Sequence, residues 1–238
     1  MRSMSTVLLA VGIACVLCSA AISAPMVLGS SGLMFVPDDT VLKQSAFNLS
    51  ANTFRTELHD TDDSFRVNTY AVNYGIWKNL EVGACLVDPK EGDKKVLLNA
   101  KYLAVAETIQ RPSITVGVVD AGSQLHKLTG SNDDPGVYIV FSKNATATAE
   151  TVARTPSKPV RAHLGFGMGV YDGVFAGLDF VIAPKVSAFV EYLSSGLRDK
   201  GGGNTAIRYE VSPGLMIEGG FVNFQDACLG VSYQAVKF

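Results

Sequence analysis

The sequence has, after Pro25, no apolar run long enough for a membrane-spanning helix. The uncharged apolar stretch near the N-terminus, Val7–Leu17, is shorter than the ~20 residues that such a helix needs. Helical spacing of apolar residues is also missing after residue 40. These absences exclude a helical membrane protein and an all-helical domain. If the chain crosses a membrane, it must do so with strands.

The sequence also has little net charge and few cysteines. The net charge is −2 and no basic patch is present, so we expect no nucleic-acid partner. Of the four cysteines, only Cys85 and Cys228 lie beyond the N-terminal stretch, and two cysteines do not make a disulfide framework. No His/Cys cluster has the spacing of metal ligands, so we expect no metal and no cofactor.

The three histidines do not favour hydrolysis. His59 and His126 fall in predicted loops, which leaves His163 alone on a predicted strand. Nucleophilic catalysis needs a Ser or Cys activated by a neighbouring base. We therefore predict no catalytic residue, no enzymatic activity, and a hydrogen-bonding role for His163.

The first residues have the order of an export signal. Arg2 precedes the apolar stretch, and small residues follow it at Ser19–Ala21. Cleavage is expected near Ala20 or Ala21, which predicts an exported protein. The predicted parts are a signal peptide, 1–21, an N-terminal segment in the periplasm or the lumen, 22–42, and an outer-membrane barrel, 43–238.

Alternating apolar and polar residues recur in short runs separated by Gly, Pro, Asn and Asp, a pattern typical of strands. Such runs predict an all-β fold, a closed antiparallel up-and-down transmembrane β-barrel of about twelve strands. The predicted strands are 44–55, 64–76, 79–88, 94–106, 112–121, 136–143, 159–170, 173–183, 185–195, 204–211, 213–223 and 227–238.

The connections predict the orientation of this barrel. Three tight turns, Trp77–Asn79, Pro184–Lys185 and Ser212–Gly214, all follow even-numbered strands and so lie at one end. Most connections after odd-numbered strands are longer and polar. Two connections are exceptions: 144–159 is long although it follows an even-numbered strand, and the turn 171–173 is short although it lies on the loop side. Short periplasmic turns and long external loops are typical of transmembrane barrels.

The polar phase of the predicted strands indicates the lumen wall. The strand at 64–76 is ambiguous, because Phe65 and Val67 favour one phase and Tyr70 and Val72 the other, and a bulge could reconcile them. We expect Arg208 to lie between acidic neighbours. The charged or titratable candidates for the lumen are Glu81, Lys101, Arg161, His163, Asp179, Glu191, Arg208, Glu210 and Glu218.

The chain ends on Phe238, directly after an alternating strand. This end resembles the last strand of outer-membrane proteins, where a terminal aromatic residue signals to the barrel-assembly machinery. Three further segments, Gly29–Pro37, Asn73–Gly83 and Val174–Tyr192, resemble the YjbH-like family of outer-membrane proteins. That resemblance implies an outer-membrane barrel linked to exopolysaccharide production, in a chain much shorter than the large family members.

The sequence is compatible with three functions. The first is a narrow passive channel or an export-associated barrel for polysaccharide or small solutes. The second is a structural or anchoring barrel whose lumen is closed by Arg–Glu pairs and the N-terminal segment. The third is a soluble secreted barrel that binds a small apolar ligand. The expected partners are outer-membrane lipid and the barrel-assembly machinery.

Overall fold

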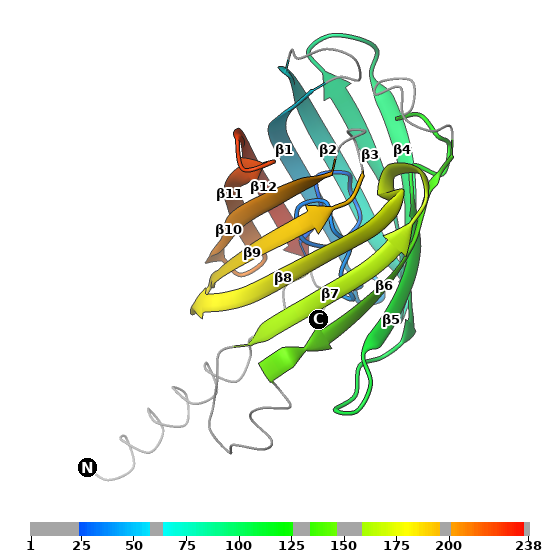
Figure 1. The fold of residues 1–238 in the computed structure, drawn as a ribbon, viewed down its shortest axis with the longest axis vertical. Coiled ribbons are helices and arrows are strands. Elements are labelled where there is room, and N and C mark those ends of the chain that lie inside the picture. The colour runs from blue at the N-terminus through cyan, green and yellow to red at the C-terminus, as the bar shows by residue number, and fades with distance from the viewer. Residues whose placement is uncertain (1–23, 58–63, 126–133, 147–158, 196–200, 236–238) are drawn as a thin grey trace, which may run out of the picture.

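The computed structural model describes residues 24–57, 64–125, 134–146, 159–195 and 201–235. It is a closed antiparallel barrel of twelve strands, so the predicted fold class is confirmed (Figure 1). The strands are β1 (Phe47–Glu57), β2 (Ser64–Trp77), β3 (Leu80–Pro89), β4 (Lys95–Val105), β5 (Ser113–Val119), β6 (Gly136–Asn144), β7 (Val160–Gly167), β8 (Gly173–Ala183), β9 (Val186–Leu193), β10 (Gly202–Ser212), β11 (Leu215–Val222) and β12 (Asp226–Ala235), with a short 3₁₀ helix, η1 (Gly169–Tyr171), between β7 and β8.

Each strand pairs with its neighbours in sequence, and β1 closes the barrel on β12. The closing ladder runs from Phe47 opposite Ala235 to Thr53 opposite Leu229. The tight turns after β2, β8 and β10 lie at one end, which we call the turn end, and the opposite end is the loop end. Register shifts occur beside these turns, for example between Gly75 and Trp77. Such shifts increase the local twist that a closed sheet requires.

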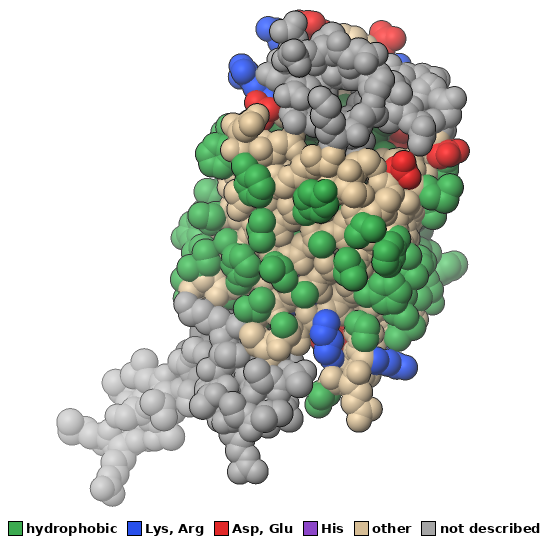
Figure 2. Space-filling view, viewed as in Figure 1, with side chains coloured by type: hydrophobic (Ala, Val, Ile, Leu, Met, Phe, Trp, Pro, Cys, Tyr) green, Lys and Arg blue, Asp and Glu red, His purple; other side chains and the backbone are tan. Residues whose placement is uncertain are grey.

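The outer face carries an apolar belt. Large apolar side chains point outward from every strand, because alternate residues of a strand face opposite sides of the sheet. Figure 2 shows these side chains across the middle of the molecule, with charged groups at both ends. Members of the belt include Tyr70, Leu98, Val116, Val137, Leu164, Leu178, Tyr192, Ile207, Ile217 and Val231, each more than a third exposed. In the described part of the chain, no helix has the length and hydropathy to span a membrane.

Strand β2 keeps a single inward phase through its pairing with β1. Phe65, Val67 and Thr69 all face the interior, and the ladder with β1 runs without interruption from Ser64 to Tyr74. The bulge that could have explained the ambiguous pattern is therefore absent from this stretch. Phe65 and Val67 belong to an apolar core inside the barrel, which is why apolar residues occur in the inward phase there.

That core exists because the N-terminal segment lies inside the barrel. Residues 24–42, called the plug below, form a compact loop in the lumen, drawn in blue behind β8 and β9 in Figure 1. Antiparallel bridges join Pro25 to Ser31 and Gly32 to Pro37. Met26, Val27 and Val36 have at most 1% of their surface exposed. The plug contributes no strand to the ladder of the barrel.

A short link connects the plug to β1 at the turn end. Ser45 has a positive φ of 66°, which turns the chain sharply. Its N–H donates to the carbonyl of Gly75 at 2.8 Å, and the N–H of Gly75 donates to the carbonyl of Ala46 at 2.9 Å. A Cβ at Gly75 would lie 2.1 Å from the carbonyl oxygen of Lys43, so only glycine allows this approach.

Candidate functional site: the plugged lumen

Glu191 on β9 holds the tip of the plug. Its carboxylate accepts hydrogen bonds from three consecutive backbone N–H groups, those of Met34, Phe35 and Val36, at 2.9 to 3.2 Å. Asn204 on β10 donates a further hydrogen bond to it at 2.7 Å. Glu191 is only 2% exposed, so these donors replace the water that a buried carboxylate would otherwise need.

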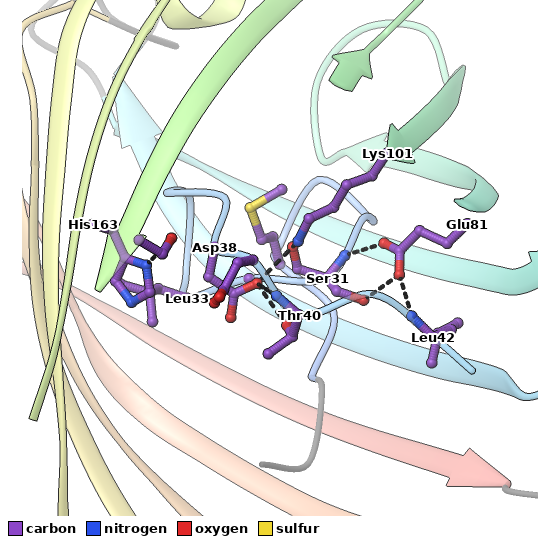
Figure 3. Close-up of polar contacts among 12 residues, drawn as sticks. Ser31, Leu33, Asp38, Thr40, Leu42, Glu81, Lys101 and His163 are labelled. Carbon is purple, nitrogen blue, oxygen red and sulfur yellow. Dashed lines mark hydrogen bonds and ion pairs between the residues drawn. The ribbon is translucent and has the colours of Figure 1, made fainter. Parts of the chain in front are cut away.

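Glu81 on β3 binds the plug at a second place. One carboxylate oxygen accepts from the N–H of Ser31 at 2.8 Å, and the other accepts from the Ser31 hydroxyl at 2.8 Å and the N–H of Leu42 at 2.9 Å. Figure 3 shows these bonds beside those of Lys101 on the neighbouring strand β4. Glu81 thus joins two parts of the plug that lie eleven residues apart.

Lys101 holds the same stretch through the opposite charge. Its ammonium group donates to the carbonyl of Ser31 at 2.7 Å and to the carboxylate of Asp38 at 2.9 Å. Burial alone would raise the pKa of the Asp38 carboxyl, but the charge of Lys101 and the hydrogen bond from Thr40 help to lower it to about 2. Lys101 is fully buried, so this ion pair lies away from bulk water.

Arg208 on β10 forms a third charged contact with the plug. Its guanidinium binds Glu218 of the neighbouring strand at 2.6 and 2.8 Å and donates to the carbonyls of Gly32 and Leu33 at 3.3 and 3.4 Å. It also lies 5.2 Å from the ring centroid of Phe189. The expected acidic neighbour is therefore Glu218, whereas Glu191 bonds to the plug.

Arg161 on β7 fixes the part of the plug near the turn end. Its guanidinium binds Asp39 of the plug at 2.7 Å and Glu107 of the β4–β5 connection at 3.1 Å. The hydroxyl of Ser113 donates to the same Asp39 carboxylate at 2.7 Å. This cluster ties the plug to β5, β7 and the connection between β4 and β5.

The sequence indicated an isolated histidine at position 163, but the structure places two polar partners beside His163. Its Nδ1 lies 2.7 Å from the hydroxyl of Ser142, and its Nε2 lies 2.9 Å from the carboxylate of Asp179. Ser142, His163 and Asp179 come from the neighbouring strands β6, β7 and β8. The sequence could not reveal this row of hydrogen-bonded residues without the strand register. Ser142 has no exposed surface, so no substrate reaches its hydroxyl in this conformation. These hydrogen bonds connect the three strands.

Two predicted positions stand apart from these contacts. Glu210 is half-buried near the turn end, where its carboxylate accepts a long 3.4 Å hydrogen bond from the N–H of Gly214. Phe238 lies outside the described residues. Its role as an assembly signal stays a prediction.

Sequence reasoning missed uncharged residues that bind the plug. Asn73 donates to the carbonyl of Gly29, Asn99 donates to that of Leu28 at 2.8 Å, and the Tyr171 hydroxyl donates to that of Phe35 at 3.1 Å. Asn73 and Asn99 share the inward phase of charged candidates on the same or adjacent strands. Counting uncharged polar residues in that phase would have found both asparagines.

Some polar groups of the wall have no partner in the plug. The Asn48 amide nitrogen and the hydroxyls of Ser50 and Thr115 are buried without a hydrogen-bond partner among the described residues. An unsatisfied buried polar group costs about 1–3 kcal/mol.

Both remaining cysteines face the interior as free thiols. Cys85 and Cys228 are buried and unbridged, in agreement with the expectation that no disulfide framework forms. The Sγ of Cys85 lies 3.8 Å from the carbonyl oxygen of Val27 in the plug. Cys85 thus reports on whether the plug is in place.

The geometry defines a closed twelve-stranded barrel filled by its own N-terminal segment. No known family model matches the chain, and none of the curated proteins does. The comparisons accordingly give no support to the YjbH-like family.

Solved structures similar to the chain include porins. They include the KdgM porin, at 11% identity and a TM-score of 0.49 over 81% of this chain and 99% of that one. Two mutants of the Rhodopseudomonas blastica porin have 13% and 12% identity and TM-scores of 0.32, over 71% of this chain and 55% of theirs. Likeness at this level carries no argument about function.

Proposed function

We propose that the protein is an outer-membrane barrel that works as a narrow passive channel for small solutes and is closed at rest by residues 24–42. One observation carries this proposal. The plug contributes no strand to the barrel, and the wall behind it bears Glu81, Lys101, Glu191 and Arg208. Its departure would therefore leave the ladder intact and uncover charged groups that water can solvate.

The apolar belt supports the membrane location. Exposed tyrosines, leucines and valines surround the barrel, and charged groups are found at both rims (Figure 2). A lipid-facing apolar band with a polar interior is typical of outer-membrane barrels. A soluble secreted barrel would place this much apolar surface in water, where it would drive aggregation. The export signal in 1–21 agrees with this location and stays a prediction.

Conductance tests the channel. The full-length mature chain and a variant lacking residues 24–42 are refolded and inserted into planar bilayers. The full-length protein should conduct rarely, and the deletion variant should conduct steadily, at least about tenfold more. In a Cys228→Ser background, Cys85 should react with a water-soluble maleimide only after the deletion, because Val27 then no longer covers it.

A non-conducting structural barrel is the second candidate, and the apolar core favours it. Met26, Leu28 and Phe35 belong to one apolar cluster with wall residues such as Phe54 and Phe65, so part of the lumen is apolar and filled. A deletion variant that is folded and labels at Cys85 but does not conduct would establish this candidate. An exopolysaccharide-export role rests on the family resemblance alone.

A further inference from the structure

The outer face of β1 and β2 carries cations that have no acidic partner among the side chains that the structure describes. Arg55 of β1 lies directly opposite Arg66 of β2 in the ladder near the loop end. The N–H of Lys90, just after β3, donates to the carbonyl of Arg66 at 2.8 Å, which extends the row by one more cation. All three residues are exposed. We call Arg55, Arg66 and Lys90 the rim cations.

Among the side chains that the structure describes, which do not include that of Glu57, no carboxylate forms an ion pair with the rim cations. The nearest acidic residue along β3, Asp88, is bound by Lys94 at 3.0 Å. Like charges directly opposite in a ladder destabilise it. An anion placed between Arg55 and Arg66 would relieve that repulsion, and a phosphate group can accept from two guanidinium groups at once.

An open groove lies on the same outer face, and its lining residues Thr53 and Asn68 are two residues along their strands from Arg55 and Arg66. It has a volume of about 340 Å³ and is lined by residues of β12, β1 and β2. Ala51 and Thr53 are the small outward residues of its floor, and Tyr70 and Leu229 flank them. Arg55, Thr53 and Ala51 share one face of β1, since side chains two residues apart point the same way. The groove therefore leads from the apolar belt to the rim cations.

We propose that this groove and the rim cations bind a phosphate-bearing acyl lipid of the leaflet at the loop end. One acyl chain lies in the groove between Tyr70 and Leu229, and the lipid phosphate lies between Arg55 and Arg66. The inference rests on the membrane location in the proposed function but does not depend on conductance.

The groove and the rim cations together favour one occupant, a lipid with both an acyl chain and a phosphate. Four residues of a strand span about 13 Å, so the step from Ala51 to Arg55 matches the reach from an acyl chain to its headgroup phosphate. A free phosphate would use the cations and leave the groove open. An uncharged lipid would fill the groove and leave the repulsion between the arginines unrelieved.

Native mass spectrometry of the refolded full-length protein in detergent tests the site with three probes: phosphatidic acid, diacylglycerol and inorganic phosphate. Phosphatidic acid should bind at least tenfold more tightly than either of the others. Arg55→Gln with Arg66→Gln should remove this preference. Ala51→Leu, which fills the groove, should weaken phosphatidic acid binding several-fold.

Matched controls lie elsewhere on the same barrel. Arg111→Gln removes an exposed arginine from the β4–β5 connection, and Ala100→Leu enlarges an outward alanine of β4. Neither should change binding. Equal affinity for phosphatidic acid and inorganic phosphate would overturn the lipid assignment, as would an unchanged affinity in the double arginine variant with normal heat-modifiable migration. Both outcomes leave the conductance test of the channel untouched.

Discussion

At the residue scale, the charged wall groups recognise the backbone of the plug. Glu191 binds three N–H groups, Lys101 binds the carbonyl of Ser31, and Arg208 binds two further carbonyls. Backbone groups are the same in every residue. The polar grip on the plug therefore depends on the wall side chains more than on the plug's own side chains.

Replacing Glu191 by Gln should loosen the plug. The amide keeps one acceptor but loses the charge, and its NH₂ group then faces backbone donors. Hydrogen bonds to a charged group contribute about 1.5–3 kcal/mol each, so we expect a loss of about 2–3 kcal/mol. Heat-modifiable gel migration measures the loss as a lower melting temperature. Glu210→Gln is the control, since Glu210 makes one 3.4 Å contact away from the plug, and equal effects of both variants would contradict the role of Glu191.

The pairing of Asp38 with Lys101 predicts a pH window. The pKa of Asp38 is lowered in the folded state to about 2 from its model-peptide value of 3.8. A depressed pKa contributes stability that is complete above about pH 4 and disappears as the pH falls through about 2. The difference in melting temperature between the wild type and Asp38→Asn should be constant from pH 7 to 4 and shrink toward pH 2. A difference that vanishes by pH 5 would contradict this assignment.

Strand register explains what the sequence could not reveal about single residues. Alternation places Glu81 and Lys101 in the inward phase, and the ladder sets them opposite each other. Yet Glu81 bonds to Ser31 and Leu42, and Lys101 bonds to Asp38. Which partners meet depends on the path of the plug. No periodic pattern in residues 24–42 encodes that path.

At the element scale, strands were predictable because each alternates between an apolar belt and a polar wall. Their observed bounds differ from the predicted ones by a few residues. The alternation failed in β2, where Phe65 and Val67 pack on the plug. A segment that lies in the lumen changes which residue types the facing wall carries, because apolar plug residues pack against apolar wall residues. Strand sequences alone therefore underdetermine the inward face.

Gly177 on β8 makes room for the plug. A Cβ at this position would lie 2.6 Å from a methyl carbon of Leu33. Gly177→Leu should push the plug away from β8, destabilise the closed form by about 1–3 kcal/mol and raise the conductance. Gly219→Leu is the control, because a Cβ there meets only Leu229 at 3.4 Å on the outer face. Planar-bilayer recording of both variants measures the effect. Equal conductance of the two variants would contradict a role of Gly177 in accommodating the plug.

At the scale of the whole molecule, the antiparallel order of the strands sets the end at which every connection lies, and the even strand count places both ends of the barrel's chain at the same end. The turns after β2, β8 and β10 lie at the turn end, where β1 starts and β12 finishes. The connections after β1, β5 and β9 lie at the opposite end. If the short turns face the periplasm, as in other transmembrane barrels, the loop end with the rim cations faces outward.

A protease-site tag tests this orientation in intact cells. A tag inserted within 122–136, between β5 and β6, should be cut by added protease, because this connection lies at the loop end. The same tag at Lys78–Asn79, in the turn between β2 and β3, should be protected until the outer membrane is permeabilised. Both tagged proteins must show heat-modifiable migration, so that cleavage reports location and not unfolding. Cleavage at Lys78–Asn79 with protection of 122–136 would show the opposite orientation of the barrel. The lipid groove beside Arg55 and Arg66 would then lie in the periplasmic leaflet.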